Sequence, residues 1–259
     1  MDIILKGVSY RYPGEEKQAL RSINTAFRAG TITAVVGRSG SGKSTLLSLL
    51  NGLRKPSEGT VECDKRNVAL VFQYPENQLF EETVIKDVEF GPKNLGRNAE
   101  ERRRDAEEAL GAVGIGRDKW NLPPFVLSGG EKRRAALAGV LAMKRDALVL
   151  DEISSGLDGE GKKIVFDILM RLRDEGKTVV FTTHDSEEAA LYADRTILLE
   201  DGMIRTDGRV EDAAEYDSSF MTDGLRLKEM LEREGISVPG PMSSLRDSIL
   251  TLSSLLKRG

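Results

Sequence analysis

A glycine-rich segment between an apolar run and a helical run constrains this chain more than any other feature of its sequence. The segment GRSGSGKST, residues 37–45, follows TITAVV and precedes LLSLLNGL. It fits the pattern GxxxxGK[ST], in which glycines let backbone N–H groups converge on phosphate oxygens at the start of a helix. The apolar run before it and the helical run after it favour a phosphate loop over an ordinary glycine-rich turn.

The side chains of this loop predict how a nucleotide binds. We expect Lys43 to reach the β and γ phosphates and the Ser44 hydroxyl to be a ligand of Mg²⁺. The other nucleotide-binding positions that we expect in the loop are Gly37, Gly40, Gly42 and Thr45.

Short, almost purely apolar runs predict strands that are buried on both faces of a sheet. These runs are TITAVVG (31–37), VALVF (68–72), ALVLD (147–151), TVVFTT (178–183) and TILLE (196–200). Apolar residues at helical spacing lie between the third and fourth runs, at Val165, Ile168, Leu169 and Leu172. Alternating strands and helices predict an α/β fold of the P-loop (RecA-like) type, with a mainly parallel sheet and ligands at the carboxyl ends of its strands.

Two further segments look helical. Residues from about 90 to 144 predict a helical subdomain inserted into a domain of residues 1–210, and the basic run Arg102–Arg104 is more typical of a solvated helix face than of a binding site. Residues 211–259 predict a short helical tail, with a break at VPGP (238–241). Its second helix carries an apolar stripe at Leu245, Ile249, Leu252 and Leu256. Either the sheet domain of the same chain or the tail of a second subunit must cover it.

Two neighbouring acids end the run LVLDE, at Asp151 and Glu152. At the carboxyl end of a buried strand they require a cation, so Asp151 suits the magnesium sphere and Glu152 is left to polarise an attacking water. The alternative is a solvated acidic loop. His184, which closes VVFTTHD, is the only histidine in 259 residues. Taken alone, a histidine at this position is more often structural than catalytic.

Composition excludes several classes of function. A formal net charge of −4 argues against a protein that binds nucleic acid through a broad basic face. The single cysteine, Cys63, has no partner in the chain for a disulfide, which fits a cytoplasmic protein. No apolar run approaches the roughly 18 residues of a membrane span, so a role at a membrane requires partners.

The segment LSGGEKRR, residues 127–134, precedes another helical run and by itself predicts only a helix cap. With the other motifs it identifies a family. The order of phosphate loop, Gln73, LSGGE, LVLDE, SGLD and His184 resembles the ATP-binding cassette family over nearly all of residues 1–210. One departure is Ile153–Ser154 after the acidic pair, where relatives usually have Pro-Thr; it affects the turn that leaves the strand.

The resemblance implies an ATP hydrolase that works as a sandwich of two cassettes, identical or paralogous. Ser128, Gly129 and Gly130 of one cassette would close over the phosphates that Lys43 of the other holds, and Asp158 of SGLD would cross the interface. The tail stripe would be covered by the tail of the second subunit.

Further roles follow from the same resemblance. Tyr12 would stack on adenine, and Gln73 would link magnesium to the transport partner. His184 would contact the γ phosphate and hold the attacking water for Glu152, which replaces the structural interpretation of that histidine.

Residues 72–96, FQYPENQLFEETVIKDVEFGPKNLG, resemble the ATPases of energy-coupling factor transporters more specifically. That resemblance implies a peripheral protein at the cytoplasmic face of the membrane, with a transmembrane coupling protein and a membrane subunit that captures a vitamin or transition-metal ion. Leu79, Phe80 and Val84 beside Glu76, Glu81 and Glu82 suit a groove for a basic amphipathic helix. Some of Pro75, Leu79, Phe80 and Val84 could instead pack the joint between subdomains, and both interpretations can hold at once.

Three other functions compete with this one. A cassette ATPase acting on DNA would usually carry a long coiled coil between Gln73 and Ser128, where this chain has only residues 74–127. A non-hydrolysing regulatory protein would be expected to lose Glu152 or His184. The ATPase of another class of importer is the remaining alternative, and the sequence identifies neither the transported substrate nor the second cassette.

Overall fold

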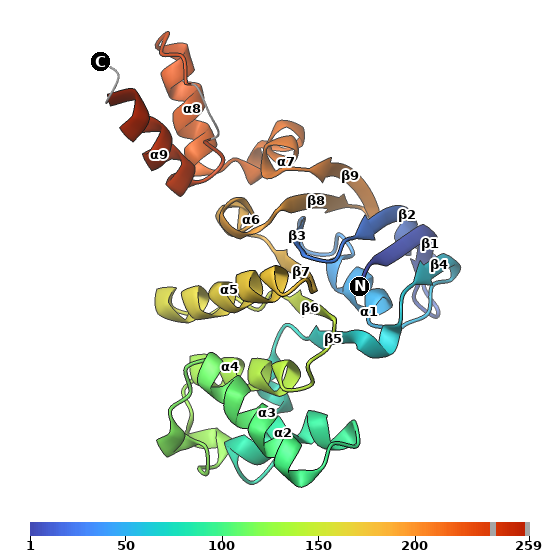
Figure 1. The fold of residues 1–259 in the computed structure, drawn as a ribbon. Coiled ribbons are helices and arrows are strands. Elements are labelled where there is room, and N and C mark those ends of the chain that lie inside the picture. Colours follow the sequence, from blue (N-terminus) through green and yellow to red (C-terminus); the bar gives the residue numbers. More distant parts are fainter. Residues whose placement is uncertain (239–241, 257–259) are drawn as a thin grey trace.

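A six-stranded sheet forms the centre of the computed structural model, which describes residues 1–238 and 242–256 (Figure 1). Its order is β5 (Val68–Val71), β6 (Ala147–Asp151), β7 (Thr178–Thr183), β3 (Thr31–Val36), β8 (Arg195–Glu200) and β9 (Met203–Gly208). The first five strands are parallel, and β9 pairs antiparallel with β8. The predicted mainly parallel α/β fold is confirmed, and each of the five predicted runs is a strand of this sheet.

The apolar runs are continuous because both faces of the sheet are covered. Along β6, Leu148 and Leu150 belong to one buried cluster, whereas Ala147 and Val149 belong to another. Successive side chains of a strand point to opposite faces, so each face contributes to its own core.

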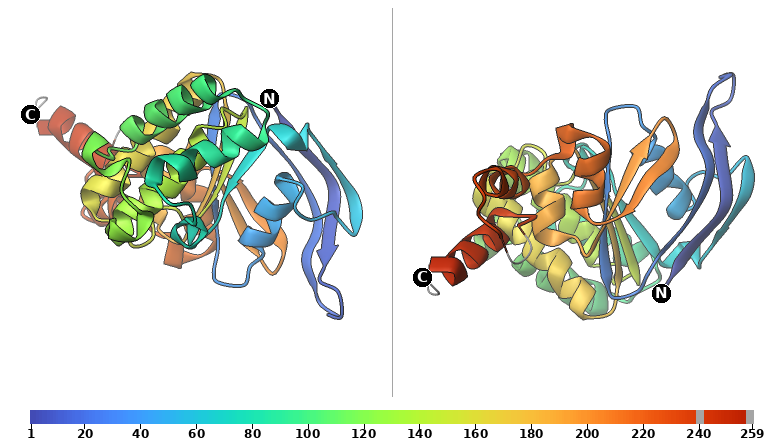
Figure 2. Two further views of the ribbon diagram at one scale, coloured as in Figure 1. Left: turned by 90° about the horizontal axis from the view of Figure 1, so that it is seen from below. Right: turned by 90° about the horizontal axis from the view of Figure 1, so that it is seen from above.

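Different layers cover the two faces of the sheet. One face packs against α1 (Lys43–Leu50) and the N-terminal strands. The other packs against the remaining helices that lie before the tail, which are α2 (Val84–Asn94), α3 (Ala99–Ala112), α4 (Gly129–Leu141), α5 (Gly159–Asp174), α6 (Ser186–Tyr192) and α7 (Val210–Tyr216). Figure 2 shows the N-terminal strands on one side of the molecule and these helices on the other.

The sequence analysis did not predict the second sheet. It is antiparallel and its order is β2 (Gln18–Phe27), β1 (Ile3–Arg11) and β4 (Glu58–Glu62). Register shifts interrupt the pairing of β1 with both neighbours, and β4 is mostly exposed. Neither strand therefore shows the clean alternation by which a half-buried strand is recognised.

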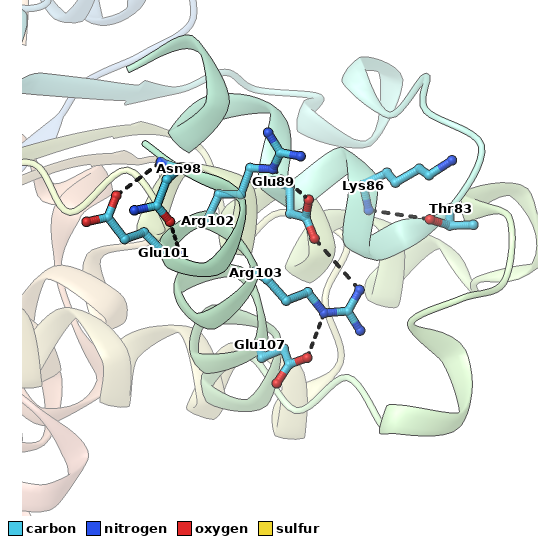
Figure 3. A network of polar contacts seen from close by, with 8 residues as sticks. All are labelled: Thr83, Lys86, Glu89, Asn98, Glu101, Arg102, Arg103 and Glu107. Atoms are coloured by element: carbon cyan, nitrogen blue, oxygen red, sulfur yellow. Dashed lines mark hydrogen bonds and ion pairs between the residues drawn. The ribbon is translucent and has the colours of Figure 1, made fainter. Parts of the chain in front are cut away.

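The helical segment contains α2, α3 and α4, and its first helix begins at Val84; its predicted extent of about residues 90–144 stays a prediction. Its basic run joins two of these helices through ion pairs (Figure 3). Arg102 Nε lies 3.2 Å from Glu89 of α2, and Arg103 lies 2.7 Å from Glu107 and 3.7 Å from Glu89. Arg102 and Arg103 therefore have a structural role, whereas Arg104 is exposed. The division of the chain at residue 210 stays a prediction.

The tail contains α8 (Asp223–Arg233) and α9 (Leu245–Leu256), which pack against each other and project from the sheet domain (Figure 1). Ser244 and Asp247 cap the start of α9, because the Asp247 amide donates to the Ser244 hydroxyl and the Ser244 amide donates to the Asp247 carboxylate. Ile249 of the predicted stripe is 58% exposed. Residues 239–241 and 257–259 lie outside the described residues, as do the side chains of Leu245 and Leu256.

Candidate functional site

The loop of residues 37–45 connects β3 to α1 with a backbone that only glycine adopts easily. Gly37, Gly40 and Gly42 have φ values of 153°, 78° and 109°. A Cβ at Gly42 would lie 2.7 Å from the carbonyl oxygen of Ala19, and one at Gly37 would meet the carbonyl oxygen of Leu199. Within the described chain no side chain caps the start of α1 at Gly42, so its first N–H groups remain available for an anion.

Lys43 is the first residue of α1 and is almost fully buried, with 6% exposure. Its Nζ donates to the carbonyl oxygens of Gly37, at 2.7 Å, and of Arg38, at 3.1 Å. Burial lowers the pKa of Lys43, while the negative charges of Glu152 and Asp151 act against that shift. The lysine, the two acids and the loop therefore share one electrostatic environment, as expected for a phosphate site.

Hydrogen bonds fix the acidic pair at the end of β6. Asp151 is buried, and its Oδ1 accepts from the Thr182 hydroxyl of β7 at 2.7 Å. The same Thr182 oxygen accepts the backbone N–H of Glu152 at 3.0 Å. Glu152 has a left-handed backbone with φ of 47°, and its Oε2 accepts from Gln73 Nε2 at 2.9 Å. The pair is held by neighbouring elements, which rules out a solvated acidic loop.

Most of these residues, but not Gly37 or Asp151, line one cavity of about 420 Å³, here called the phosphate-loop cavity. Its volume is typical of a small-molecule site. The structure brings together in its lining most of the residues expected to bind nucleotide or metal or to catalyse, namely Tyr12, Gly40, Gly42, Lys43, Ser44, Thr45, Gln73 and Glu152.

Tyr12 lies at the edge of the phosphate-loop cavity, held by contacts that suit an aromatic platform. Its hydroxyl shares a hydrogen bond of 2.9 Å with the Thr45 hydroxyl. The guanidinium of Arg54 lies over the Tyr12 ring, 4.7 Å from its centroid, and Tyr10 packs against the ring edge-on. These contacts fix the ring next to the phosphate loop.

His184 follows β7 directly and is exposed. It makes no hydrogen bond with any residue that the structure describes, so it is not a satisfied core histidine. Together with Glu152 it lines a smaller cavity of about 230 Å³, and Glu152 also borders the phosphate-loop cavity. His184 therefore lines the same small cavity as Glu152 and is not packed in the protein core.

Besides Gly37, four predicted nucleotide contacts are not part of the phosphate-loop cavity. Ser128, Gly129 and Gly130 form the start of α4, where the Ser128 hydroxyl accepts the N–H of Glu131 at 3.3 Å. Asp158 caps α5 by accepting the N–H of Gly161 at 2.8 Å. All four belong to helix starts that do not line this cavity, so within one chain the phosphate loop and LSGG remain apart.

Sequence reasoning missed a buried carboxylate behind the site. Glu188 of α6 accepts at 2.7 Å from the hydroxyls of Ser154 and Thr183, and Lys162 donates to its other oxygen at 2.7 Å. These contacts join the turn after Glu152, the strand end before His184 and helix α5. An acid in the first turn of a helix is usually explained by the helix dipole, so the sequence pattern did not indicate this role.

The segment after Gln73 combines exposed aromatic side chains with buried anchors. Phe80 is 64% exposed and touches Phe90 edge-on, with ring centroids 4.9 Å apart. Val84 is buried, as the packing interpretation required. Glu76 forms a two-point ion pair with Arg133 of α4, through bonds of 3.1 and 2.8 Å. The segment is thus fastened to the helix that starts at LSGG.

The donor set fits magnesium in a nucleotide site. Ser44, Gln73 and Asp151 offer oxygen ligands, which this ion prefers. The described residues contain no cluster of three or more His, Cys, Asp or Glu side chains that would hold a metal by themselves. Mg²⁺ usually binds through one or two protein oxygens together with phosphate oxygens, so a single buried carboxylate is sufficient.

Comparisons with known proteins agree on one family. A family model described as "ABC transporter" matches residues 20–155. The energy-coupling factor transporter ATP-binding protein EcfA2 of Streptococcus pyogenes serotype M28 is 40% identical over 284 residues, which cover 100% of both proteins.

Solved structures give the same result. The structure of cbiO1 from Clostridium perfringens, part of the ABC transporter complex cbiONQ, has a TM-score of 0.74 and 32% identity, covering 90% of this chain and 96% of that one. A dimeric post-hydrolysis state of the ATP-binding cassette MJ0796, bound to ADP and Pi, has a TM-score of 0.72 and 30% identity, covering 80% and 98%.

Proposed function

The chain belongs to the ABC transporter family of ATPases, and on this premise we propose that it is the ATP-hydrolysing subunit of an energy-coupling factor importer. In this function, ATP binding and hydrolysis by a pair of cassettes drive uptake of a vitamin or transition-metal ion through membrane partners. One observation carries the proposal: Lys43, Gln73 and Glu152 line the same cavity. Gln73, which bonds Glu152, also begins the segment to Phe90 that is predicted to form the groove for a partner helix.

ATP hydrolysis requires a phosphate cradle and a base, and the phosphate-loop cavity provides both. The N–H groups at the start of α1 and the Lys43 ammonium bind the phosphates, while Glu152 orients a water and accepts its proton. His184, next to Glu152, holds that water and contacts the γ phosphate. Tyr12 stacks on the adenine ring.

Magnesium is the metal that the site would hold, through the Ser44 hydroxyl, the Gln73 amide oxygen and the Asp151 carboxylate. When bound, Mg²⁺ supplies positive charge that offsets the charge on the β and γ phosphates. The bond from Thr182 to Asp151 orients this carboxylate, and Gln73 also bonds Glu152.

The active form in this proposal contains two cassettes. Ser128, Gly129, Gly130 and Asp158 lie outside the phosphate-loop cavity of their own chain, so in a head-to-tail pair they are free to complete the cavity of the other chain. The solved relative with ADP and Pi is a dimer, which supports the same arrangement. The exposed Ile249 of the tail adds a second contact between the subunits.

The membrane partners in this proposal dock near Phe80. None of the helices that the structure describes is long and apolar enough to cross a bilayer. The exposed Phe80 and Phe90 rings and the neighbouring acids Glu81 and Glu82 suit a basic amphipathic helix of a transmembrane coupling protein. A separate membrane subunit captures the transported substrate, and the cassette lies on the cytoplasmic face.

Co-purification from native membranes followed by mass spectrometry tests this proposal. The expected result is a complex of two cassettes, identical or paralogous, with a transmembrane coupling protein and a small capture subunit. Reconstituted vesicles should take up the captured substrate only with hydrolysable ATP. A complex with the permease of another importer class would support the alternative function, and a chain without membrane partners would contradict both.

A further inference from the structure

A second cavity of about 330 Å³ lies at the opposite end of the strands from the phosphate loop. We call it the basal cavity. Ala147, the first residue of β6, lines it, whereas Asp151 ends the same strand behind the phosphate loop. Four steps of about 3.3 Å separate these residues, or about 13 Å along the strand. The basal cavity is therefore distinct from the nucleotide site.

The basal cavity is built across the joint between the helical segment and the sheet. Helices α3 and α4 form one wall, and β5, β6 and the end of α5 form the other. Its floor is apolar and mostly buried, formed by Ala69, Ala109, Val140, Leu148 and Leu172. An apolar floor beneath a few polar groups is the usual construction of a site for a small organic molecule.

Charged side chains line the rim of the basal cavity. Asp105 is fully buried and is neutralised by Arg97 and by Lys144, which lies 2.9 Å from its Oδ1. Lys144 also lies 2.8 Å from Glu108. The hydrogen bond that Lys144 donates to Glu108 and its contact with Asp105 raise the pKa of Lys144, with Glu108 the larger contributor. Both acids that α3 contributes to the rim, Asp105 and Glu108, are thus already compensated.

The positive charges on the other side of the rim lack such compensation. Arg145 makes no ion pair with any residue in the described part of the chain, and its Nε is buried without a hydrogen-bond partner. Among the described residues, Lys177 Nζ donates only to the backbone oxygen of Arg145, at 2.8 Å. Arg171 has Glu175 at 3.8 Å, a long contact on the surface. A cation beside apolar surface is stabilised when an anion reaches it.

We propose that the basal cavity binds a small amphiphilic anion, whose carboxylate pairs with Arg145 and Lys177 and whose apolar body lies on the floor. Arginine recognises carboxylates through two parallel N–H bonds, and the volume admits a short aliphatic or aromatic acid. Such a ligand contacts both α4 and β6. It therefore holds the helical segment, which carries LSGG, against the sheet, which carries the acidic pair.

Binding of octanoate to the purified chain tests the proposal. Saturation-transfer NMR and isothermal titration should detect octanoate binding. The melting temperature of the protein should rise with octanoate concentration, because the ligand binds the folded state. Acetate, which lacks the apolar body, and octylammonium, which reverses the charge, should bind at least tenfold more weakly. Equal binding of octanoate and octylammonium would overturn the proposal, since it would mean that charge is not recognised.

Two variants locate the bound octanoate. Arg145→Gln removes the unpaired charge and should weaken binding about ten- to a hundredfold, as expected for losing a charge-assisted hydrogen bond. Ala112→Phe keeps every charge but fills part of the cavity, and should also abolish binding. The matched control is Arg104→Gln on the exposed side of α3, which should bind octanoate as the wild type does. Circular dichroism and melting curves check that all three fold.

The outcomes are decisive in both directions. Loss of octanoate binding in folded Arg145→Gln, with full binding in Arg104→Gln, supports the site. Unchanged affinity in Arg145→Gln places octanoate on another apolar surface and overturns it. ATP affinity should not differ among these variants, so a failure of the ATPase proposal would be seen separately in the nucleotide titration.

Discussion

The side-chain amide of Gln73 donates a hydrogen bond of 2.9 Å to the carboxylate of Glu152. Gln73 belongs to the loop after β5, and Glu152 follows β6, the adjacent strand. The bond holds Oε2 of Glu152 and leaves Oε1 available for a water. It also links the candidate base through one contact to the segment that carries Phe80.

Replacing Glu152 by Gln should reduce ATP turnover by about two to four powers of ten, the range for losing a general base. The variant keeps an amide oxygen that Gln73 still bonds, so ATP affinity and the fold should be retained. Nucleotide-bound dimers should accumulate, which gel filtration with ATP would detect. Glu160→Gln, at the exposed start of α5, is the matched control. Near-normal turnover in E152Q, measured with the membrane partners present, would refute the assigned role.

His184→Ala should slow hydrolysis far more than it weakens ATP binding. The side chain is exposed and bonds no other described residue, so its removal should change the free energy of unfolding by no more than about 0.5 kcal/mol. Turnover, a nucleotide titration and a melting curve measure the three quantities. A large loss of melting temperature would restore the structural interpretation of this histidine.

The sequence predicted the central sheet because strands buried on both faces leave continuous apolar runs. It did not predict β1 and β4, where register shifts and exposed residues disturb the pattern. The phosphate loop and the acidic pair could be predicted from their motifs, because both follow strands of one sheet, whereas Tyr12 and Gln73 were expected only from the family resemblance. Glu188 and Thr182 could not, because their partners come from elements far away in the sequence.

The ion pair between Glu76 and Arg133 should contribute stability that depends on pH. Burial raises the pKa of Glu76, but the hydrogen bonds and charge of Arg133 outweigh it and hold the pKa below the ordinary 4.5. A lowered carboxylate pKa stabilises the folded state above the unfolded pKa, and this stability is lost as pH falls through the folded pKa. The contribution should therefore be full at neutral pH and disappear below pH 4.5.

Denaturant unfolding of Glu76→Gln tests this contribution. At pH 7 the variant should be less stable by about 1 kcal/mol, since a neutral hydrogen bond replaces a charge-assisted one. The difference from the wild type should shrink in acid. Glu82→Gln is the control, because its ion pair with Lys86 is exposed and should matter much less. A difference that does not change with pH would mean that Glu76 acts through packing alone.

Ile249→Lys should weaken the nucleotide-free dimer and leave the monomer folded. The side chain is 58% exposed in the single chain, so a lysine there meets water in the monomer but is buried in a pair of tails. Sedimentation velocity measures the dimer. Leu250→Lys is the comparison, because Leu250 is 62% exposed but lies about 100° further around the helix, outside the stripe. An unchanged sedimentation profile in I249K would exclude the tail stripe as an interface.

Phe80→Asp should uncouple the cassette from its membrane partners and leave ATP binding intact. Phe80 is 64% exposed and touches Phe90 only edge-on, so the change opens no core, and the phosphate-loop cavity does not include it. Burying such a ring in a partner groove is worth roughly 1.5 to 3 kcal/mol, so docking should weaken about ten- to a hundredfold.

Co-purification of the detergent-solubilised membrane subunits and substrate uptake in vesicles measure this uncoupling by F80D. Leu53→Asp is the matched control, because Leu53 is 61% exposed and lies outside the segment from Gln73 to Phe90. If both variants retain docking and uptake, Phe80 only packs the joint between the subdomains. If both lose them equally, added negative charge rather than the lost ring explains the effect. Only a loss confined to Phe80→Asp places the docking groove on this segment.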